Sequence, residues 1–321
     1  MHRIVHALAA LVVALAATPA VAQPTWPDKP VKLVVGFTAG SATDVTARMF
    51  AQKFQEAWGH PVVVENIAGN SGAIGTDRVA KAAPDGYTLM WSGNAAITIL
   101  PSLQTLPFDP LKDLAPISTA LRMPSIMMVN NDLPVKSIAE LIGYAKANPG
   151  KLSYGTPGVG TPQHVAGELF CHLAGIKMEH IPYRGANLAD VMSGVVQVGI
   201  QNAGSSLPLV HDGRVRGIGI TSLQRSPNAP ELPTFNESGF PGFEATSWFA
   251  LMGPAGLPKP IVDKVRAEAL KVLADPEMKQ KFAALGLDTV GSTPEETHAA
   301  IAADIPKWAQ VIKDANIKSG N

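Results

Sequence analysis

The chain has 321 residues, 46% of them hydrophobic, and equal numbers of basic and acidic side chains, 26 of each. This balance provides no long-range field that would attract nucleic acid or an anionic membrane, so affinity for an anion must come from local geometry. Cys171 is the only cysteine in the sequence, which excludes a disulfide bond within the chain, and its apolar helical surroundings favour a small buried residue over a reactive thiol.

The first 22 residues have the layout of a secretory signal peptide. A basic start at His2-Arg3 precedes an apolar run from Ile4 to Ala17, and Ala20-Val21-Ala22 ends the segment before Gln23. The apolar run is shorter than the roughly 20 residues that span a bilayer, which favours a cleaved signal peptide over a retained membrane anchor. Cleavage predicts a soluble, periplasmic chain of 299 residues, enough for about two domains at ~150 residues each.

The mature chain begins with buried strands that alternate with amphipathic helices. Strands are predicted at Val31–Gly36, Val62–Glu65 and Thr88–Trp91, and helices at Asp44–Ala57 and Ala73–Ala82. This β-α-β-α-β order predicts a parallel sheet with helices on both faces.

The same alternation returns after residue 125. Further strands are predicted at Ile126–Val129, Leu152–Gly155, Met178–Ile181, Val196–Gln201 and Val215–Thr221, with helices that open at Ser137, run over Thr161–Ala174 and lie near Leu188–Ser193. Ser137 and Glu140 form a capping box. The sequence therefore predicts a second α/β unit.

The C-terminal third has a different pattern. Trp248–Met252 is predicted as a strand, and only helices follow, at Ile261–Ala274, at Pro276–Leu285 and after the Thr293 cap. Because these helices need a sheet to pack on, we expect the chain to return to the first unit. Domain 1 would then comprise residues 23–125 plus 245–321, and domain 2 residues 126–244. Two crossings between domains predict a hinge and a ligand cleft.

Two turns that join a strand to a helix carry the candidate binding groups. The first is Phe37-Thr38-Ala39-Gly40-Ser41-Ala42-Thr43-Asp44, and the second is Gly158-Val159-Gly160-Thr161-Pro162-Gln163-His164. Ser41 or Thr43 is the predicted cap of the first helix and Thr161 that of the second, and Pro162 suits the first helical position. Free N–H groups at a helix start, together with the helix dipole, favour an anionic ligand.

Either turn alone has a second interpretation, because many α/β loops are rich in glycine for conformational reasons only. The two together favour binding, since both follow the carboxyl end of a strand, where open α/β sheets bind ligands. Each dipole contributes about 0.3–2 kcal/mol and each charge-assisted hydrogen bond about 1.5–3 kcal/mol. Such terms can sum to the roughly −8 kcal/mol of micromolar binding without a basic cluster.

These turns belong to a longer set of segments that resembles the Bug family, the substrate-binding components of tripartite tricarboxylate transporters. The matching segments, in chain order, are Trp26-Pro27-Asp28-Lys29-Pro30, Gly69-Asn70-Ser71-Gly72-Ala73-Ile74-Gly75, Asp85-Gly86-Tyr87-Thr88-Leu89, Gly160-Thr161-Pro162-Gln163-His164, Gly167-Glu168-Leu169-Phe170, Pro182-Tyr183-Arg184-Gly185 and Gly253-Pro254-Ala255-Gly256. Their order makes the resemblance specific, and it covers nearly the whole mature chain.

The resemblance implies a two-domain α/β periplasmic binding protein of type II, the Venus-flytrap fold, with no cofactor, no metal and no catalytic residue. It implies a monomer that captures a carboxylate and delivers it to the membrane components of a tripartite tricarboxylate transporter. Besides the two turns, the family contacts would carry over to Asn94 with Ala95, to Tyr183-Arg184-Gly185 and to Asn202. Arg184 presents paired donors for a carboxylate, although an exposed loop arginine is the other interpretation.

Two departures from the family pattern bear on the ligand. In the first turn Thr38 stands where the family usually has Pro, and Ser41 where it has a second Gly, so both changes add hydroxyl groups. After the strand that ends near Ile200 the family commonly has an Asp, whereas this chain reads Gln201-Asn202-Ala203-Gly204. Because a cleft-facing acid could pair with an amino group, its absence indicates a carboxylate ligand without an ammonium group.

Other functions remain as alternatives to solute binding for transport. A periplasmic hydrolase could use a serine with His164 in the same cleft, and it would need a nucleophile within hydrogen-bond reach of that histidine. A sensory subunit would share the cleft and differ only in its partner. A metal site at His164, Cys171 and His172 is disfavoured because adjacent residues on a helix point in different directions.

Overall fold

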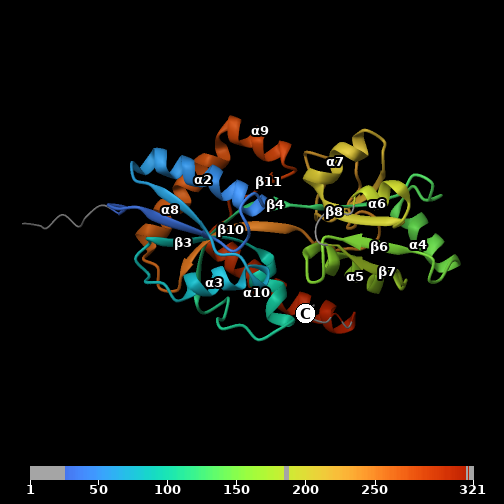
Figure 1. The fold of residues 1–321 in the computed structure, drawn as a ribbon, viewed down its shortest axis with the longest axis horizontal. Coiled ribbons are helices and arrows are strands. Elements are labelled where there is room, and N and C mark those ends of the chain that lie inside the picture. Colours follow the sequence, from blue (N-terminus) through green and yellow to red (C-terminus); the bar gives the residue numbers. More distant parts are fainter. Residues whose placement is uncertain (1–25, 184–187, 316, 318–321) are drawn as a thin grey trace, which may run out of the picture.

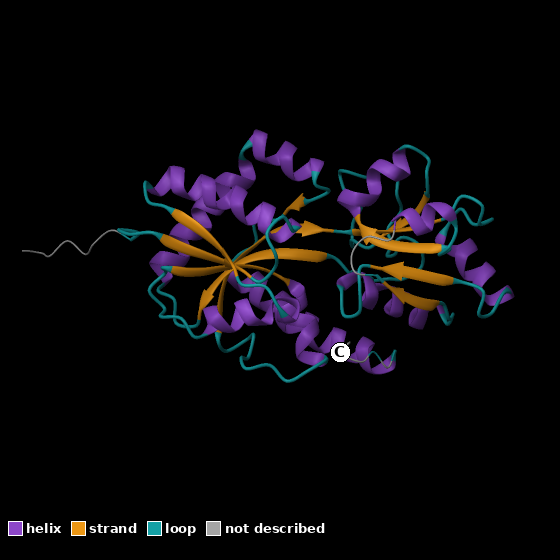
Figure 2. Ribbon diagram, in the orientation of Figure 1, coloured by secondary structure: helices purple, strands orange, loops and turns teal. Residues whose placement is uncertain are grey.

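The computed structural model describes residues 26–183, 188–315 and 317 of the chain. The expected signal peptide at residues 1–22 and the candidate contacts Arg184 and Gly185 lie outside the described residues. Two α/β lobes lie side by side, each built around its own sheet (Figures 1 and 2). The two predicted α/β units are therefore two separate lobes, each with its own sheet and helices.

The first lobe contains the longer sheet. Its strands are β1 (Val31–Val35), β2 (Val62–Asn66), β3 (Thr88–Gly93), β4 (Leu114–Met123), β10 (Ser247–Pro254) and β11 (Asp288–Thr289). Its helical segments are α2 (Ala42–Trp58), η1 (Asn70–Gly72), α3 (Ala73–Ala80), η2 (Ala95–Ile99), η3 (Leu100–Ser102), α8 (Lys259–Ala274), α9 (Pro276–Ala284) and α10 (Pro294–Asp314). Across the described residues, this sheet has six strands in the order β11-β4-β10-β3-β1-β2.

The second lobe is formed by the middle of the chain. Its strands are β5 (Ser125–Val129), β6 (Ser153–Thr156), β7 (Glu179–Pro182), β8 (Val198–Asn202) and β9 (Arg216–Ile220). Its helices are α4 (Ile138–Ala147), α5 (Pro162–Ala174), α6 (Leu188–Ser193) and α7 (Ala203–His211). The strand order is β7-β6-β8-β5-β9.

Both sheets are mixed, which corrects the expectation of a parallel sheet. β1 pairs in parallel with β2 and β3, as the β-α-β-α-β pattern predicts. β10 lies between β3 and β4 and runs antiparallel to both. In the second lobe β5 is antiparallel to β8 and β9. The sheets are mixed because β10 and β5 are the strands by which the chain enters a lobe. Each of these two strands therefore runs away from the junction.

The expectation that only helices follow the strand at 248–252 was also incomplete. β11 is a strand of two residues that pairs antiparallel with β4, and such a short strand leaves no alternating pattern in the sequence. The ten-residue β4 and the helix α7, which contains Pro208, were not predicted either.

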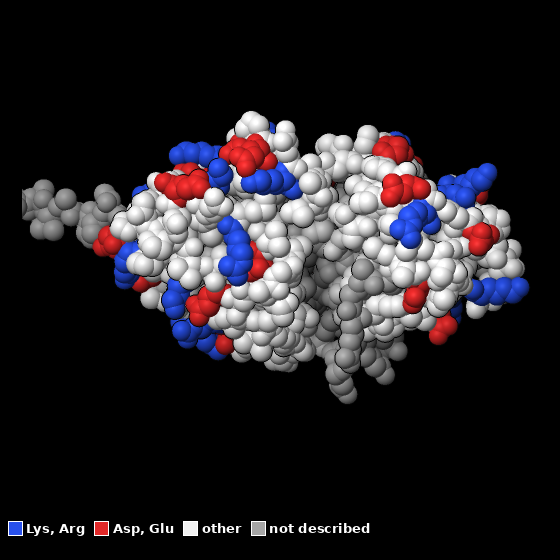
Figure 3. Space-filling view, turned by 45° about the horizontal axis from the view of Figure 1, so that its top comes forward, with Lys and Arg blue, Asp and Glu red and all other residues white. Residues whose placement is uncertain are grey.

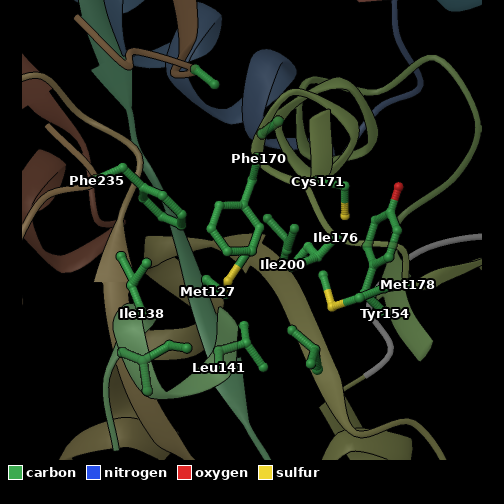
Figure 4. Packing of buried hydrophobic residues seen from close by; sticks show 14 of the residues in the cluster. Met127, Ile138, Leu141, Tyr154, Phe170, Cys171, Ile176, Met178, Ile200 and Phe235 are labelled. Carbon is green, nitrogen blue, oxygen red and sulfur yellow. The ribbon is translucent and has the colours of Figure 1, made fainter. Parts of the chain in front are cut away.

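The core of the second lobe lies between its sheet and α4 and α5. Met127 and Ile200 from the sheet meet Ile138 from α4 and Phe170 from α5, as the close view of this cluster shows (Figure 4). The same cluster contains Trp308, Val311 and Ile312 from α10. The N-terminal half of α10 packs on the first lobe, through Ile301, so this helix spans the junction between the lobes.

Within residues 26–183, 188–315 and 317, no helix combines the length and apolar character needed to cross a bilayer.

Candidate functional site

The carboxyl ends of the parallel strands in both sheets lie at the junction of the lobes. In the first lobe Gly93 at the end of β3 pairs with Phe249, two residues after β10 begins. In the second lobe Asn202 at the end of β8 pairs with Ser125, the first residue of β5. Because the chain crosses between lobes just before β10 and just before β5, these strand ends face the crossing points.

The predicted site residues follow these strand ends. The first turn comes after β1, which is parallel to β3, and the second turn comes after β6, which is parallel to β8. Asn94 follows β3, Tyr183 follows β7, and Asn202 ends β8. Figure 3 shows a groove between the two lobes, with most of the visible charged side chains away from it.

Asp44 organises the first turn from within. The residue is 2% exposed. Its carboxylate accepts the Gly40 N–H at 2.9 Å, Arg48 Nε at 3.0 Å and Asn66 Nδ2 at 2.8 Å. Burial raises the pKa of Asp44, but the hydrogen bonds from Arg48, Gly40 and Asn66 outweigh it and hold that pKa below its usual range. Asp44 is therefore a charged acceptor whose bonds all go to the protein.

The helix cap in the first turn is Ser41, one of the two predicted candidates. Ser41 Oγ accepts the Asp44 N–H at 3.2 Å, and Ser41 has an extended backbone. This leaves the N–H groups of Ala42 and Thr43 with no acceptor among the described residues. Thr38, Ala39, Gly40 and Ala42 are exposed, whereas Thr43 is buried. The positive end of α2 thus has two N–H groups without a protein acceptor among the described residues, a type of site that favours an anion.

The second turn is capped by Thr161, also as predicted. Thr161 Oγ1 accepts the His164 N–H at 3.3 Å and donates to Gly158 O at 2.7 Å. Pro162 has no N–H, and the Gln163 N–H has no acceptor among the described residues. Gly158 and Gly160 have φ of 153° and 73°, a region that favours glycine. Val159 is 39% exposed, so the tip of this turn is open.

His164 lies inside the second lobe. It is 5% exposed, its Nδ1 accepts the Gly160 N–H at 3.1 Å, and its ring stacks on His180 with centroids 3.8 Å apart. Burial lowers the pKa of His164 to about 3, with a further contribution from His180. Its position near the helix start predicts a side chain that faces the cleft, whereas the structure buries it and engages it in holding the turn.

Three other candidates are also held by protein partners. Asn94 is 2% exposed and donates from Nδ2 to Thr246 O, just before β10. Asn202 Oδ1 accepts Gln163 Nε2 at 2.5 Å. Tyr183 donates its hydroxyl to Asp190 at 2.6 Å, and burial and this carboxylate raise the pKa of Tyr183 to about 12. Ala95 is half-buried at the start of η2. Contact of these residues with a ligand stays a prediction.

Several residues that shape the site were missed in the sequence. Arg48 could have been found, because it stands four residues after Asp44 on the predicted helix. Asn66, which also donates to Phe37 O at 3.0 Å, comes from the neighbouring strand and leaves no local signal. The same holds for His180 and for Leu103, whose side chain from the first lobe lies 3.1 Å from where a Cβ on Gly160 would be.

The positions of the side chains bear on the alternative of a metal site. Across the described ranges, no three His, Cys, Asp or Glu side chains gather closely enough to hold a metal ion. Cys171 is buried, and burial raises the pKa of its thiol to about 12, which agrees with its interpretation as a packed core residue.

A family profile described as "Tripartite tricarboxylate transporter family receptor" matches residues 46–317. This chain belongs to that receptor family. Protein BugT of Bordetella pertussis is 36% identical over 301 residues, covering 92% of this chain and 91% of BugT. The resemblance to the Bug proteins is therefore confirmed. The receptors of this family bind solutes, and the two-lobed α/β fold with a cleft between the domains matches solved periplasmic binding proteins.

Two of the similar solved structures are described with bound carboxylates. An R. palustris protein with adipate is 34% identical to this chain, with a TM-score of 0.77, and the match covers 91% of this chain and 99% of that one. MatC from Rhodopseudomonas palustris with bound malate is 27% identical, with a TM-score of 0.74, covering 89% and 100% of the two chains. Both ligands are dicarboxylates without an ammonium group, so carboxylate binding occurs among similar members of this receptor family.

Proposed function

We propose that this protein is an exported solute-binding protein that captures a small carboxylate between its lobes for a tripartite tricarboxylate transporter. The observation that carries the proposal is the pair of capped helix starts, one per lobe, at strand ends that face the lobe junction. Their unpaired N–H groups supply positive partial charge without any basic side chain. A carboxylate that bridges them would hold the lobes together.

The remaining parts of the proposal concern the chain as a whole. A signal peptide of residues 1–22 would be removed, leaving a periplasmic monomer that meets the membrane components of the transporter. Domain 1 would comprise residues 23–125 and 245–321, and domain 2 residues 126–244. The division between the two sheets supports these boundaries, with α10 reaching from the first domain onto the second.

The ligand is proposed to be a carboxylate without an ammonium group, such as a di-, aliphatic or aromatic carboxylate. Support comes from the stretch after β8, where Asn202, Ala203 and Gly204 provide no acid. The Asn202 side chain is an amide already bound to Gln163, so it supplies no negative charge to an amino group. The adipate and malate of the similar structures agree with this class.

A hydrolase in the same cleft is less well supported. The imidazole of His164 receives the Gly160 N–H on Nδ1 and is stacked on His180, and among the described residues no hydroxyl or thiol bonds to it. A hydroxyl does approach His180, since Thr156 Oγ1 lies 2.7 Å from Nε2. However, Thr156 is fully buried, which keeps a substrate from reaching it.

A thermal-shift screen of the mature chain tests the proposed ligand class. We expect di- or other simple carboxylates at 100 times their dissociation constant to add about 2.7 kcal/mol and to raise the melting temperature by several degrees. Aspartate and glutamate should produce smaller shifts, because the stretch after β8 offers no acid to an ammonium group. If no carboxylate shifts the transition and an ester or amide is turned over, the hydrolase is the better account. Equal or tighter binding of aspartate would overturn the ligand class.

A further inference from the structure

The two turns share a hydrogen-bonding plan although their sequences differ. In the first, Gly40 donates its N–H to the Asp44 side chain at 2.9 Å, and Asp44 donates its own N–H to Ser41 Oγ. In the second, Gly160 donates its N–H to His164 Nδ1 at 3.1 Å, and His164 donates its N–H to Thr161 Oγ1. In both turns the side chain four residues after a glycine holds that glycine's amide.

The plan extends one helical turn further, to an ionisable side chain four residues on. Arg48 stands four residues after Asp44 and pairs with it at 2.9 Å. Glu168 stands four residues after His164, with Oε1 3.9 Å from Nε2. Asp44, which holds the first turn, thus has a basic neighbour on its helix. His164, which holds the second turn, has an acidic one.

The hydrogen bond to Gly160 requires one form of His164. A ring nitrogen accepts only when it carries no proton, so His164 must be neutral with its proton on Nε2. The described groups around the ring are His180 from β7, Glu168 from α5 and Tyr154 from β6, whose hydroxyl donates to Glu168 at 2.5 Å. Burial lowers the pKa of His164 to about 3 and that of His180 to about 4, which keeps both rings neutral near pH 7.

We propose that His164 is a positioning residue, the neutral counterpart of Asp44, which fixes the second turn by accepting the Gly160 N–H. Fixing Gly160 sets the direction of the neighbouring backbone amides, because the turn passes through two glycines that would otherwise leave it free to rotate. A neutral acceptor achieves this without adding a negative charge at the second helix start. The link to ligand capture rests on the proposed carboxylate-binding function.

The test compares two substitutions with a control on the same helix. His164→Asn keeps an acceptor atom at the Nδ1 position, whereas His164→Leu removes it. His172→Leu is the matched control, since His172 lies on α5 with its side chain 57% exposed. With adipate and malate as probes in calorimetry at pH 7.5, we expect His164→Leu to raise the dissociation constant about tenfold or more. His164→Asn should stay within about threefold of the parent, and His172→Leu should leave binding unchanged.

A second readout needs no ligand and separates this proposal from the proposed function. In nitrogen-15 NMR of the unliganded chain, His164 should keep the neutral tautomer with the proton on Nε2 from pH 8 to pH 5. The Gly160 amide proton should keep its resonance position in His164→Asn and move in His164→Leu. If neither adipate nor malate bound the parent chain, only the proposed carboxylate capture would be contradicted. A His164 that titrates near pH 6.5, carries its proton on Nδ1, or can become Leu without moving Gly160 would overturn the positioning role.

Discussion

Replacing Asp44 with Asn should unfold the first turn locally and lower the free energy of unfolding by about 2–4 kcal/mol. The Asp44 carboxylate accepts three hydrogen bonds, from Gly40, Arg48 and Asn66, and Arg48 Nη2 also forms an ion pair with it at 2.9 Å. An amide of the same shape has to turn its NH₂ toward some of these donors. It also leaves the Arg48 cation without its acid.

The same substitution should weaken carboxylate binding by at least tenfold, the equivalent of about 1.4 kcal/mol, because Gly40 loses the acceptor that shapes the loop. Chemical denaturation and calorimetry measure the two effects. Asp263→Asn is the control, because Asp263 also forms an i,i+4 pair, with Lys259 at 2.7 Å, but its side chain is 57% exposed. Such exposed pairs contribute about 0–1 kcal/mol. If Asp44→Asn behaved like this control, Asp44 would have no organising role.

Truncating Trp308 should have the other large effect, because its ring belongs to the helix that spans the junction. Trp308 is 1% exposed and packs in the core of the second lobe, while the start of α10 is fixed to the first lobe where Thr297 Oγ1 accepts the Thr119 N–H at 3.0 Å. Trp308→Ala should cost about 3–5 kcal/mol and loosen the second lobe from α10. Denaturation measures the cost, and small-angle scattering measures the separation of the lobes.

Two further variants make the Trp308 prediction specific. Trp308→Phe should retain most of the stability, since the indole Nε1 has no hydrogen-bond partner among the described residues. Phe282→Ala removes a fully buried ring from the first lobe alone, so it should lower stability without changing the scattering of the unliganded chain. If Trp308→Ala scattered like Phe282→Ala, α10 would not couple the lobes.

The local part of the site could be predicted from the sequence. The caps Ser41, Ser137, Thr161 and Thr293 each accept the predicted backbone N–H, because a cap depends on residues only three positions apart. The strands before the two turns were predicted for a similar reason, since a buried strand is a short apolar run. Family membership could also be predicted, because the motifs follow one another in a specific order.

The contacts between distant segments could not be predicted. Asn94 binds Thr246 across 152 positions, and Asn66 reaches Asp44 from another strand. Whether a polar side chain faces a ligand or a protein partner depends on such pairings, and no local pattern encodes them. This explains why the partner of Asn94 could not be predicted, while its contact with a ligand stays a prediction. The mixed sheets have the same origin, because the insertion of β10 between β3 and β4 is decided by where the returning chain packs.

Calorimetry with an acid and its uncharged analogue tests the central claim most directly. The acid that gives the largest thermal shift is titrated into the chain without residues 1–22, alongside the diamide or ester with the same carbon skeleton. If helix-start N–H groups hold the ligand, the acid should bind in the micromolar range, where binding is about −8 kcal/mol. The uncharged analogue should bind at least about 100-fold more weakly, because it loses the charge-assisted hydrogen bonds and the dipole interaction. Equal binding of the two compounds, or binding of the uncharged analogue alone, would contradict the account.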